Sequence, residues 1–258
     1  MSAPLLEARA VTRRYRMPRE SLFRAPPVLT AVDSASFVLE RGETLGIVGE
    51  SGSGKSTLAR MVMAFETPDA GQILFDGQDL GQLSAGDLRR QRQRFQMVFQ
   101  DPFGSLDPRR SVGWSIAEPL RAIGAENRAH RVAEALEQVN LHAADAEKYP
   151  HEFSGGQRQR IAIARAIVTR PELIVADEAV SALDVSVQAQ ILNLLMDLQD
   201  ELGLAMLFIS HDLAVVASIC DQILVMQHGK SIEQGRATEV LNAPTQDYTK
   251  SLLIAAGA

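Results

Sequence analysis

The fold is decided by one stretch of sequence, Gly49-Glu50-Ser51-Gly52-Ser53-Gly54-Lys55-Ser56-Thr57. It fits the phosphate-binding pattern G-x-x-x-x-G-K-[ST], which begins here at Gly49 and ends at Ser56. The apolar run 45–48 before it is typical of a buried strand, and residues 58–63 after it are compatible with a helix. A strand, this loop and a helix, in that order, predict a binding site for a nucleoside triphosphate.

The residue types in this stretch suit both a phosphate and a cation. Glycine at positions 49, 52 and 54 permits positive φ angles and lets backbone N–H groups approach an anion. The following helix adds its own unpaired N–H groups and the positive end of its dipole. Lys55 supplies a positive charge for the β- and γ-phosphates, and the Ser56 hydroxyl suits Mg²⁺. The alternative is a flexible loop that matches by chance, and the flanking strand and helix argue against it.

Composition limits the classes of protein that this chain can belong to. The 258 residues, 46% hydrophobic and 22% charged, predict one α/β domain with an inserted subdomain. A net charge of −6 argues against nucleic acid as a partner. The single cysteine, Cys220, excludes an intrachain disulfide and a multi-thiolate zinc site and fits a reducing cytosol. No apolar stretch reaches the roughly 18 residues of a membrane span, so we expect another chain to supply any such spans.

The hydrophobic pattern predicts a phosphate-loop NTPase core of the α/β class with a mixed, mainly parallel sheet. Runs typical of strands lie at Leu5–Thr12, Ala31–Leu39, Ile73–Phe75, Phe95–Gln100, Leu173–Ala176, Leu204–Ile209 and Ile223–Met226. The earliest of them predict an N-terminal antiparallel β-subdomain. Between the first two, Arg13–Thr30 holds three prolines and five arginines and is predicted to be a surface loop. We expect a helical subdomain over about 101–165, inserted into a catalytic core formed by 1–100 and 166–258.

Two acids follow the buried run Leu173–Ala176. Asp177 is expected to hold Mg²⁺, directly or through water, because this cation prefers oxygen ligands. Glu178 is suited to polarising a water molecule for attack on the γ-phosphate. Taken alone, such a pair is more often the polar end of a strand. The phosphate loop in the same chain favours the functional interpretation.

The stretch Ser154-Gly155-Gly156-Gln157 predicts the start of a helix. Ser154 and Gln157 have the spacing of a capping box. Two glycines in a first turn reduce helix stability, and a cap alone does not need them. Their presence is expected if a phosphate approaches the backbone at this point.

These motifs together resemble those of the ATP-binding-cassette (ABC) ATPase family. The order is the phosphate loop, Gln100, Ser154–Gln157, Asp177-Glu178, Ser181–Asp184 and His211, and it spans nearly the whole chain. In this family two cassettes meet head to tail, so the resemblance implies that Ser154–Gln157 of one chain covers the nucleotide of another. Phe153 stands where a leucine is more usual in that signature. Ala179 stands where the family usually has proline after the catalytic glutamate.

The resemblance also assigns a role to each site residue. Glu178, His211, Lys55 and Gln100 are implied in catalysis, with Ser56, Gln100 and Asp177 holding Mg²⁺. Tyr15 is placed like the aromatic residue that stacks on adenine. The implied ATP-binding residues are Tyr15, Gly49, Glu50, Ser51, Gly52, Ser53, Gly54, Lys55, Ser56, Thr57, Ser154, Gly155, Gly156, Gln157 and Asp184.

Further segments are similar to the oligopeptide, dipeptide and nickel uptake branch of the family. They are the long segment between Tyr15 and Ala31, the run Phe99–Arg109, Asp184–Gln190 and the C-terminal Tyr248–Leu253. The similarity implies an ATPase that works with transmembrane permease subunits at the cytoplasmic face of a bacterial inner membrane. A second cassette, identical or homologous, and indirectly an extracytoplasmic solute-binding protein are the other implied partners. Peptides, a nickel chelate or a glutathione-like solute are the implied cargo.

Two other functions stay open from the sequence. A soluble cassette that acts on DNA or ribosomes would carry a long coiled-coil insertion, zinc cysteines or a tandem cassette, and none occurs in these 258 residues. A weakly active, regulatory cassette in a heterodimer is the other alternative. Ala179 slightly favours it, whereas Lys55, Asp177, Glu178 and His211 argue against it.

Overall fold

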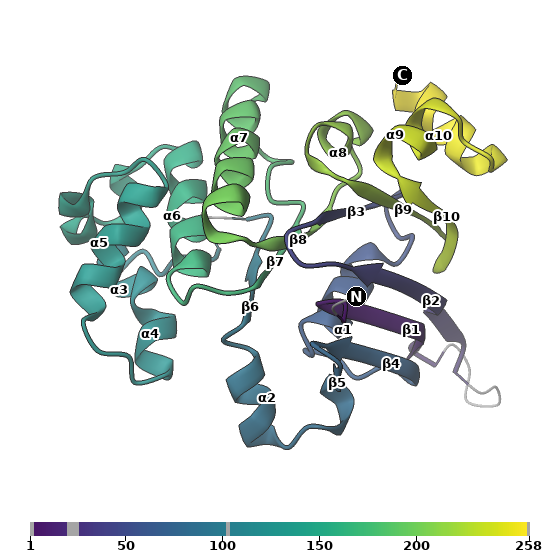
Figure 1. Cartoon of the computed structure of the whole chain (residues 1–258), viewed down its shortest axis with the longest axis horizontal. Coiled ribbons are helices and arrows are strands. Elements are labelled where there is room, and N and C mark those ends of the chain that lie inside the picture. The colour runs from purple at the N-terminus through teal and green to yellow at the C-terminus, as the bar shows by residue number, and fades with distance from the viewer. Residues whose placement is uncertain (1–2, 20–25, 102–103, 257–258) are drawn as a thin grey trace. The chain divides into compact units, whose positions relative to one another are not determined.

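The computed structural model describes residues 3–19, 26–101 and 104–256, which form two compact units. Unit 1 comprises the chain up to Ala85 and from Leu207 onward, and unit 2 comprises Gly86–Met206. The strands are β1 (Leu6–Arg16), β2 (Val28–Leu39), β3 (Thr44–Val48), β4 (Ala70–Phe75), β5 (Gln78–Asp79), β6 (Phe95–Val98), β7 (Leu173–Asp177), β8 (Ala205–Ile209), β9 (Gln222–Gln227) and β10 (Lys230–Arg236). The α-helices are α1 (Lys55–Val62), α2 (Ala85–Gln91), α3 (Val112–Ile116), α4 (Glu118–Ala122), α5 (Arg128–Gln138), α6 (Gly155–Ile167), α7 (Val185–Leu202), α8 (Leu213–Ile219), α9 (Ala237–Asn242) and α10 (Asp247–Ala256), labelled in Figure 1.

An antiparallel sheet with the strand order β2-β1-β4-β5 opens unit 1. Its central strand, β1, places Leu6 opposite Leu39 of β2 and Phe75 of β4. Residues directly opposite one another on neighbouring strands share one face of the sheet, and all three of these side chains are buried. This sheet confirms the predicted N-terminal antiparallel subdomain.

The two long strands extend into the segment predicted to be a loop. β1 continues to Arg16 and β2 begins at Val28, so the prediction of a surface loop from Arg13 to Thr30 is wrong at both ends. Arg13 is opposite Val32, and its guanidinium pairs with Glu66 and with Asp69. These ion pairs accommodate an arginine-rich strand. The prolines at 18, 26 and 27 lie beyond the strand ends. Residues 20–25 of the predicted loop lie outside the described residues, and so do residues 102–103 of the run 99–109.

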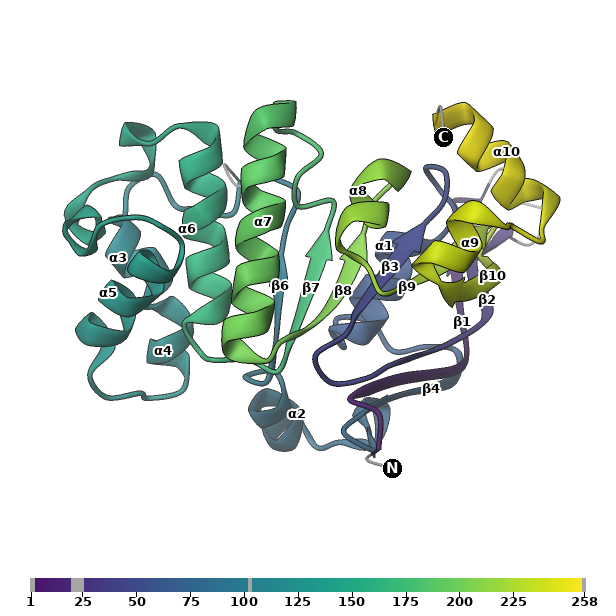
Figure 2. The ribbon, with the colours of Figure 1, turned by 45° about the horizontal axis from the view of Figure 1, so that its top comes forward.

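The second sheet of unit 1 contains the strand that enters the phosphate loop. β3 runs parallel to β9, with Leu45 opposite Gln222, and β9 pairs antiparallel with β10. The backbone N–H of Ser210, just past β8, donates to Ile47 O at 3.2 Å. Every residue of β3 is buried, as expected for a strand covered on both faces. Helix α8 packs on β3 and α9 on β9 and β10, as Figure 2 shows.

Unit 2 combines a parallel strand pair with a group of helices. β6 runs parallel to β7, with Phe95 opposite Leu173, and the backbone of Ala205 in β8 donates to Glu172 O at 2.9 Å. Helix α6 contacts α3, α5 and α7 (Figure 1). Among the described residues from 104 to 172 there are helices and turns but no strand. The helical character predicted for this part of the chain is therefore observed.

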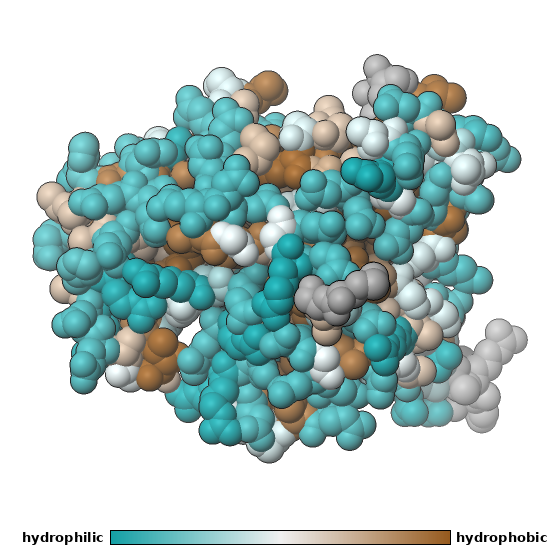
Figure 3. Space-filling model, in the orientation of Figure 1, coloured by the Kyte–Doolittle hydropathy of each residue, from teal (hydrophilic) through white to brown (hydrophobic). Residues whose placement is uncertain are grey.

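The surface is mostly hydrophilic on the face drawn in Figure 3, with hydrophobic residues scattered over it. No helix within the described ranges is long and apolar enough to cross a bilayer. One large aromatic side chain on the surface of unit 2 is that of Trp114 in α3. The guanidinium carbons of Arg110 and Arg121 lie 4.8 Å and 4.2 Å from the centroid of its ring.

Candidate functional site

The loop between β3 and α1 follows neighbouring backbone so closely that two of its positions require glycine. Gly49 and Gly54 have φ angles of +150° and +105°. A Cβ atom at Gly49 would lie 2.2 Å from Met226 O, and one at Gly54 would lie 2.3 Å from the backbone oxygen of Ala31. The loop is also joined to the β9–β10 turn, because Gly229 N donates to Ser53 O at 3.0 Å. These contacts fix the backbone whose N–H groups are predicted to bind phosphate.

The side chain of Lys55 folds back into this loop. Its Nζ donates to Gly49 O at 2.7 Å and to Glu50 O at 2.9 Å, and it lies 3.5 Å from Ser53 Oγ. Lys55 is only 5% exposed, and a buried charge needs such polar partners. Phosphate oxygens would give this ammonium group charged acceptors, which form stronger hydrogen bonds than neutral ones. The loop therefore fits the predicted anion.

The N-terminus of α1 carries the partial positive charge that attracts an anion. Gly54 is the N-cap, in the left-handed conformation, and the first turn holds no acidic residue. The backbone of Leu58 makes the first intrahelical bond, to Gly54 O at 2.9 Å. Ser56 lies in that turn and is exposed, where its hydroxyl can ligate a cation. Helix N-termini of this kind bind phosphate through N–H groups and the dipole.

The C-terminal helix α10 also contacts the loop. Glu50 N donates to the phenol oxygen of Tyr248 at 3.2 Å. The chain just before α10 is held by Glu233 of β10, whose carboxylate accepts from Thr245 N at 2.7 Å and Gln246 N at 3.2 Å. Burial raises the pKa of Glu233, but its hydrogen bonds outweigh burial and keep that pKa below the ordinary value. No motif predicts the contact between Glu50 and Tyr248.

His211 lies close to the start of the phosphate loop along the sheet. It follows Ser210, whose N–H bonds Ile47 O two residues before Gly49. Asp212 caps the next helix, because its carboxylate accepts from the N–H of Ala214 at 2.9 Å. The imidazole of His211 is exposed. Within unit 1, the structure thus brings His211 to the end of the strand that carries the loop.

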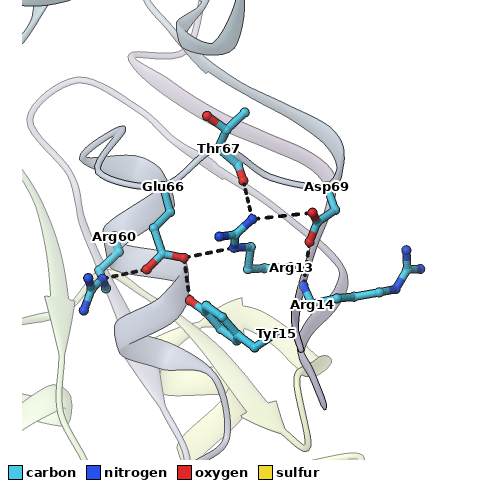
Figure 4. A network of polar contacts seen from close by, with 7 residues as sticks. All are labelled: Arg13, Arg14, Tyr15, Arg60, Glu66, Thr67 and Asp69. Carbon is cyan, nitrogen blue, oxygen red and sulfur yellow. Dashed lines mark hydrogen bonds and ion pairs between the residues drawn. The ribbon is translucent and has the colours of Figure 1, made fainter. Parts of the chain in front are cut away.

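Tyr15 takes part in a polar network that Figure 4 shows in close-up. Its hydroxyl donates to Glu66 Oε2 at 2.5 Å, and Arg13 Nε donates to the same oxygen at 2.9 Å. Arg60 Nε, from α1, lies 2.9 Å from Glu66 Oε1. Arg13 also pairs with Asp69. The predicted adenine-stacking residue is therefore held by Glu66, a carboxylate that belongs to none of the sequence motifs.

In unit 2, Asp177 ends β7 and Glu178 begins a tight turn. Glu178 has a φ angle of +48°, a left-handed conformation that is uncommon for residues other than glycine and occurs often at functional sites. Its backbone oxygen accepts from Ser181 N at 3.1 Å and Ser181 Oγ at 3.0 Å. Ala179 and Val180, at the centre of this turn, are buried. The turn closes with alanine in place of the proline usual in the resembling family.

Gln100 is tied to the same turn. Its Nε2 donates to Ser181 Oγ at 3.1 Å, so one serine hydroxyl links Gln100 to the backbone of Glu178. No group of three or more His, Cys, Asp or Glu side chains within the described ranges could hold a metal ion. The predicted Mg²⁺ donors, Ser56, Gln100 and Asp177, are instead a hydroxyl, an amide and a carboxylate. Such a mixed set of oxygen donors fits a cation that is also bound by phosphates.

The predicted capping box at the start of α6 is present. Gln157 N donates to Ser154 Oγ at 3.3 Å, and Ser154 N donates to Gln157 Oε1 at 2.9 Å. The two glycines differ in their surroundings. A Cβ atom on Gly155 would meet nothing within 4 Å, whereas one on Gly156 would lie 2.5 Å from Cγ1 of Val187 in α7. Packing of α6 against α7 therefore also requires a very small residue at position 156, whereas Gly155 has open space beside its backbone.

Asp184 is the N-cap residue of α7. Its backbone oxygen accepts from Gln188 N at 2.8 Å, and its side chain is exposed and makes no capping hydrogen bond. The exposed Ser154 side chain belongs to the same unit. Both residues thus present polar groups at helix N-termini of unit 2.

Comparison with known proteins agrees with these features. The ABC transporter family model matches residues 32–181. The dipeptide transport ATP-binding protein DppF of Haemophilus influenzae is 47% identical over 257 residues, which cover 98% of this chain and 78% of the relative. The glutathione import ATP-binding protein GsiA of Salmonella paratyphi A is 51% identical over 256 residues, covering 98% of this chain and 41% of the relative.

A solved structure has the same fold. It is the dimeric, post-hydrolysis state of the ATP-binding cassette MJ0796 bound to ADP and Pi, with a TM-score of 0.77 and 28% identity over 90% of this chain and 98% of that one. These matches confirm the resemblance that the motifs indicated, and with it the α/β phosphate-loop fold. The chain belongs to the ABC transporter family.

Proposed function

We propose that this chain is the ATP-binding and ATP-hydrolysing subunit of an importer for peptides or a related small solute. The phosphate loop is the main support for this function, because Lys55 is buried there against backbone oxygens at the N-terminus of α1. The names of the dipeptide and glutathione import relatives support the type of cargo. A nickel chelate remains a third candidate cargo.

In this proposal the chain's own residues have distinct tasks. Lys55 and the first turn of α1 bind the β- and γ-phosphates, and Tyr15 stacks on adenine. Ser56, Asp177 and Gln100 hold Mg²⁺, which when bound neutralises phosphate charge. Glu178 accepts a proton from the attacking water, and His211 donates a hydrogen bond to the γ-phosphate.

A second cassette completes the site. Ser154–Gln157 and Asp184 close over the nucleotide of the partner cassette, which is a second copy or a homologous chain. The open space at Gly155 and the dimeric state of MJ0796 support this arrangement. We further infer that residues 101–165 form the helical signature subdomain of a single cassette. Permease subunits at the cytoplasmic face of a bacterial inner membrane, and indirectly a solute-binding protein, complete the system.

Substitution of the general base tests the catalytic part of the proposal. Glu178→Gln should bind MgATP with unchanged affinity while hydrolysis falls by a factor of about 100 or more. The variant should also accumulate as an ATP-bound dimer in size-exclusion chromatography. Turnover is measured as phosphate release by the purified chain, with and without its co-expressed permease.

Two control variants make the result decisive. Lys55→Ala should lose both binding and turnover, so any phosphate release that it retains measures contaminating ATPases. Glu172→Gln removes a carboxylate that pairs with Arg94 and should keep normal turnover. Unaltered turnover in Glu178→Gln, above the Lys55→Ala background, would remove Glu178 from the mechanism.

A further inference from the structure

Glu66 is a mostly buried carboxylate at which three donors meet. Its side chain is 14% exposed and lies just after the C-terminal end of α1. Oε2 accepts from the Tyr15 hydroxyl at 2.5 Å and from Arg13 Nε at 2.9 Å, while Oε1 lies 2.9 Å from Arg60 Nε (Figure 4). The carboxylate therefore joins two residues of β1 to one of α1.

The Glu66 side chain is ionised at neutral pH. Burial raises its pKa, but the hydrogen bonds from Tyr15 and Arg13 and the charge of Arg60 outweigh burial, so the pKa lies below its ordinary value. A hydrogen bond from a phenol to a charged carboxylate is shorter and stronger than one between neutral groups. The phenol end of Tyr15 is thus firmly held.

One face of the Tyr15 ring is already occupied. The guanidinium carbon of Arg13 lies 5.1 Å from the ring centroid, within the range of a cation–π contact. The two residues are two apart on β1, so their side chains leave the same face of the strand. With Arg13 over one face and the hydroxyl bound, the opposite face of this half-buried ring is the one left for a flat ligand to stack on.

The backbone of Glu66 is fixed to the helix that follows the phosphate loop. Phe65 N donates to Arg60 O at 2.8 Å, and Glu66 N donates to the same oxygen at 3.3 Å. That helix begins at Lys55. Through Glu66, the Tyr15 ring is therefore tied to the same rigid element as the lysine of the phosphate loop.

We propose that Glu66 is a positioning residue for the base of the nucleotide: with Arg13 it holds the Tyr15 ring so that its open face stacks on adenine. This inference rests on the proposed function, in which Tyr15 stacks on adenine. A ring that is ordered before binding does not lose rotational freedom when the base arrives, which strengthens binding. Glu66 therefore strengthens binding of the base and does not affect binding of the phosphates.

The test compares a ligand that has a base with one that has none. Isothermal titration calorimetry with MgADP and with magnesium tripolyphosphate is carried out on the full chain and on Glu66→Gln, which keeps the size of the side chain but removes its charge. We expect ADP affinity to fall roughly three- to tenfold in Glu66→Gln, with tripolyphosphate affinity unchanged. Asp76→Asn is the matched control, because it removes the carboxylate of an exposed ion pair with Arg41 in the same unit. It should alter neither affinity.

Two variants of Tyr15 separate this inference from the proposed function. Tyr15→Ala should weaken ADP binding about tenfold or more, the usual effect of losing an aromatic stacking partner. If it does not, the adenine role of Tyr15 in the proposed function fails. Tyr15→Phe keeps the ring but loses the hydroxyl, so its effect on ADP affinity should not add to that of Glu66→Gln in a double-mutant cycle.

Other results would overturn the positioning role while leaving that of Tyr15 intact. An equal loss of ADP and tripolyphosphate affinity in Glu66→Gln would assign Glu66 a purely structural task. Tighter ADP binding in that variant would mean that Glu66 holds the ring away from the base. Additive effects of Tyr15→Phe and Glu66→Gln on ADP affinity would contradict the proposed link between the two residues. Tyr15→Phe removes the same hydrogen bond from the other side, so it tests the link even where Glu66→Gln folds poorly.

Discussion

Two glycines of the phosphate loop differ in what surrounds them. Gly54 is one of the two glycines that the pattern requires, and Gly52 stands at one of its variable positions. A Cβ atom on Gly54 would lie 2.3 Å from Ala31 O, whereas one on Gly52 would meet nothing within 4 Å. Both have positive φ angles, +105° and +80°. Gly52→Ala therefore adds only backbone strain, about 1 kcal/mol, while Gly54→Ala must also displace a neighbouring strand.

The expected outcome is a clear difference between the two variants. Gly52→Ala should retain nucleotide binding and lose about 1 kcal/mol of unfolding free energy. Gly54→Ala should lose nucleotide binding and be destabilised further. Urea denaturation and titration with ADP measure both properties. Equal losses in the two variants would show that the approach to Ala31 does not determine the effect.

Predictability from sequence also differs from residue to residue. Lys55, Ser56, Asp177 and Glu178 could be found because each motif is short and its spacing is set by local geometry. Glu66 and Tyr248 could not, because their partners lie 51 and 198 residues away and no local pattern links such positions. The close packing of Gly156 against Val187 could not be predicted either, because the two residues belong to different helices.

At the scale of elements, the close approach of α6 to α7 can be tested by substitution. A Cβ atom on Gly156 would lie 2.5 Å from Val187 Cγ1, and overpacking of this kind costs roughly 1–3 kcal/mol. Gly156→Ala should therefore be destabilised, and adding Val187→Ala should recover most of the loss. Gly155→Ala should be neutral or slightly stabilising, because alanine favours a helix more than glycine does.

Chemical denaturation measures these differences in unfolding free energy among the wild-type chain, Gly156→Ala, the double variant with Val187→Ala, and Gly155→Ala. A failure of Val187→Ala to restore stability would contradict the packing explanation. Gly155→Ala has a second expected effect: it should weaken the ATP-dependent dimer of the Glu178→Gln background, because its methyl group fills space kept for the partner's nucleotide. Chromatography in the presence of ATP checks this point.

The elements themselves were predictable where one physical effect dominates. β3, β7, β8 and β9 are continuous apolar runs with few or no exposed residues, and such runs predict strands covered on both faces. The ends of β1 and β2 were missed because arginine and proline suggested a loop. The acids that pair with Arg13 come from a segment more than 50 residues later, which no propensity can anticipate.

For the whole molecule, ligand binding and stability are linked. A ligand that binds only the folded chain stabilises it, by about 2.7 kcal/mol at a hundredfold excess over its dissociation constant. For a chain of this size MgATP should therefore raise Tm by roughly 5–10 °C. Differential scanning calorimetry of the wild-type chain and of Lys55→Ala, which should show no rise, measures the effect. An equal rise in Lys55→Ala would place binding outside the phosphate loop.

The position of Trp114 has a practical consequence for such experiments. It is the chain's one tryptophan, it belongs to unit 2, and the guanidinium groups of Arg110 and Arg121 both lie close to its ring. The one cysteine, Cys220, belongs to unit 1, and burial together with the charge of Asp221 raises the pKa of its thiol. Tryptophan emission therefore follows unit 2, and thiol labelling follows unit 1. The natural chain thus carries a separate spectroscopic or chemical reporter in each half.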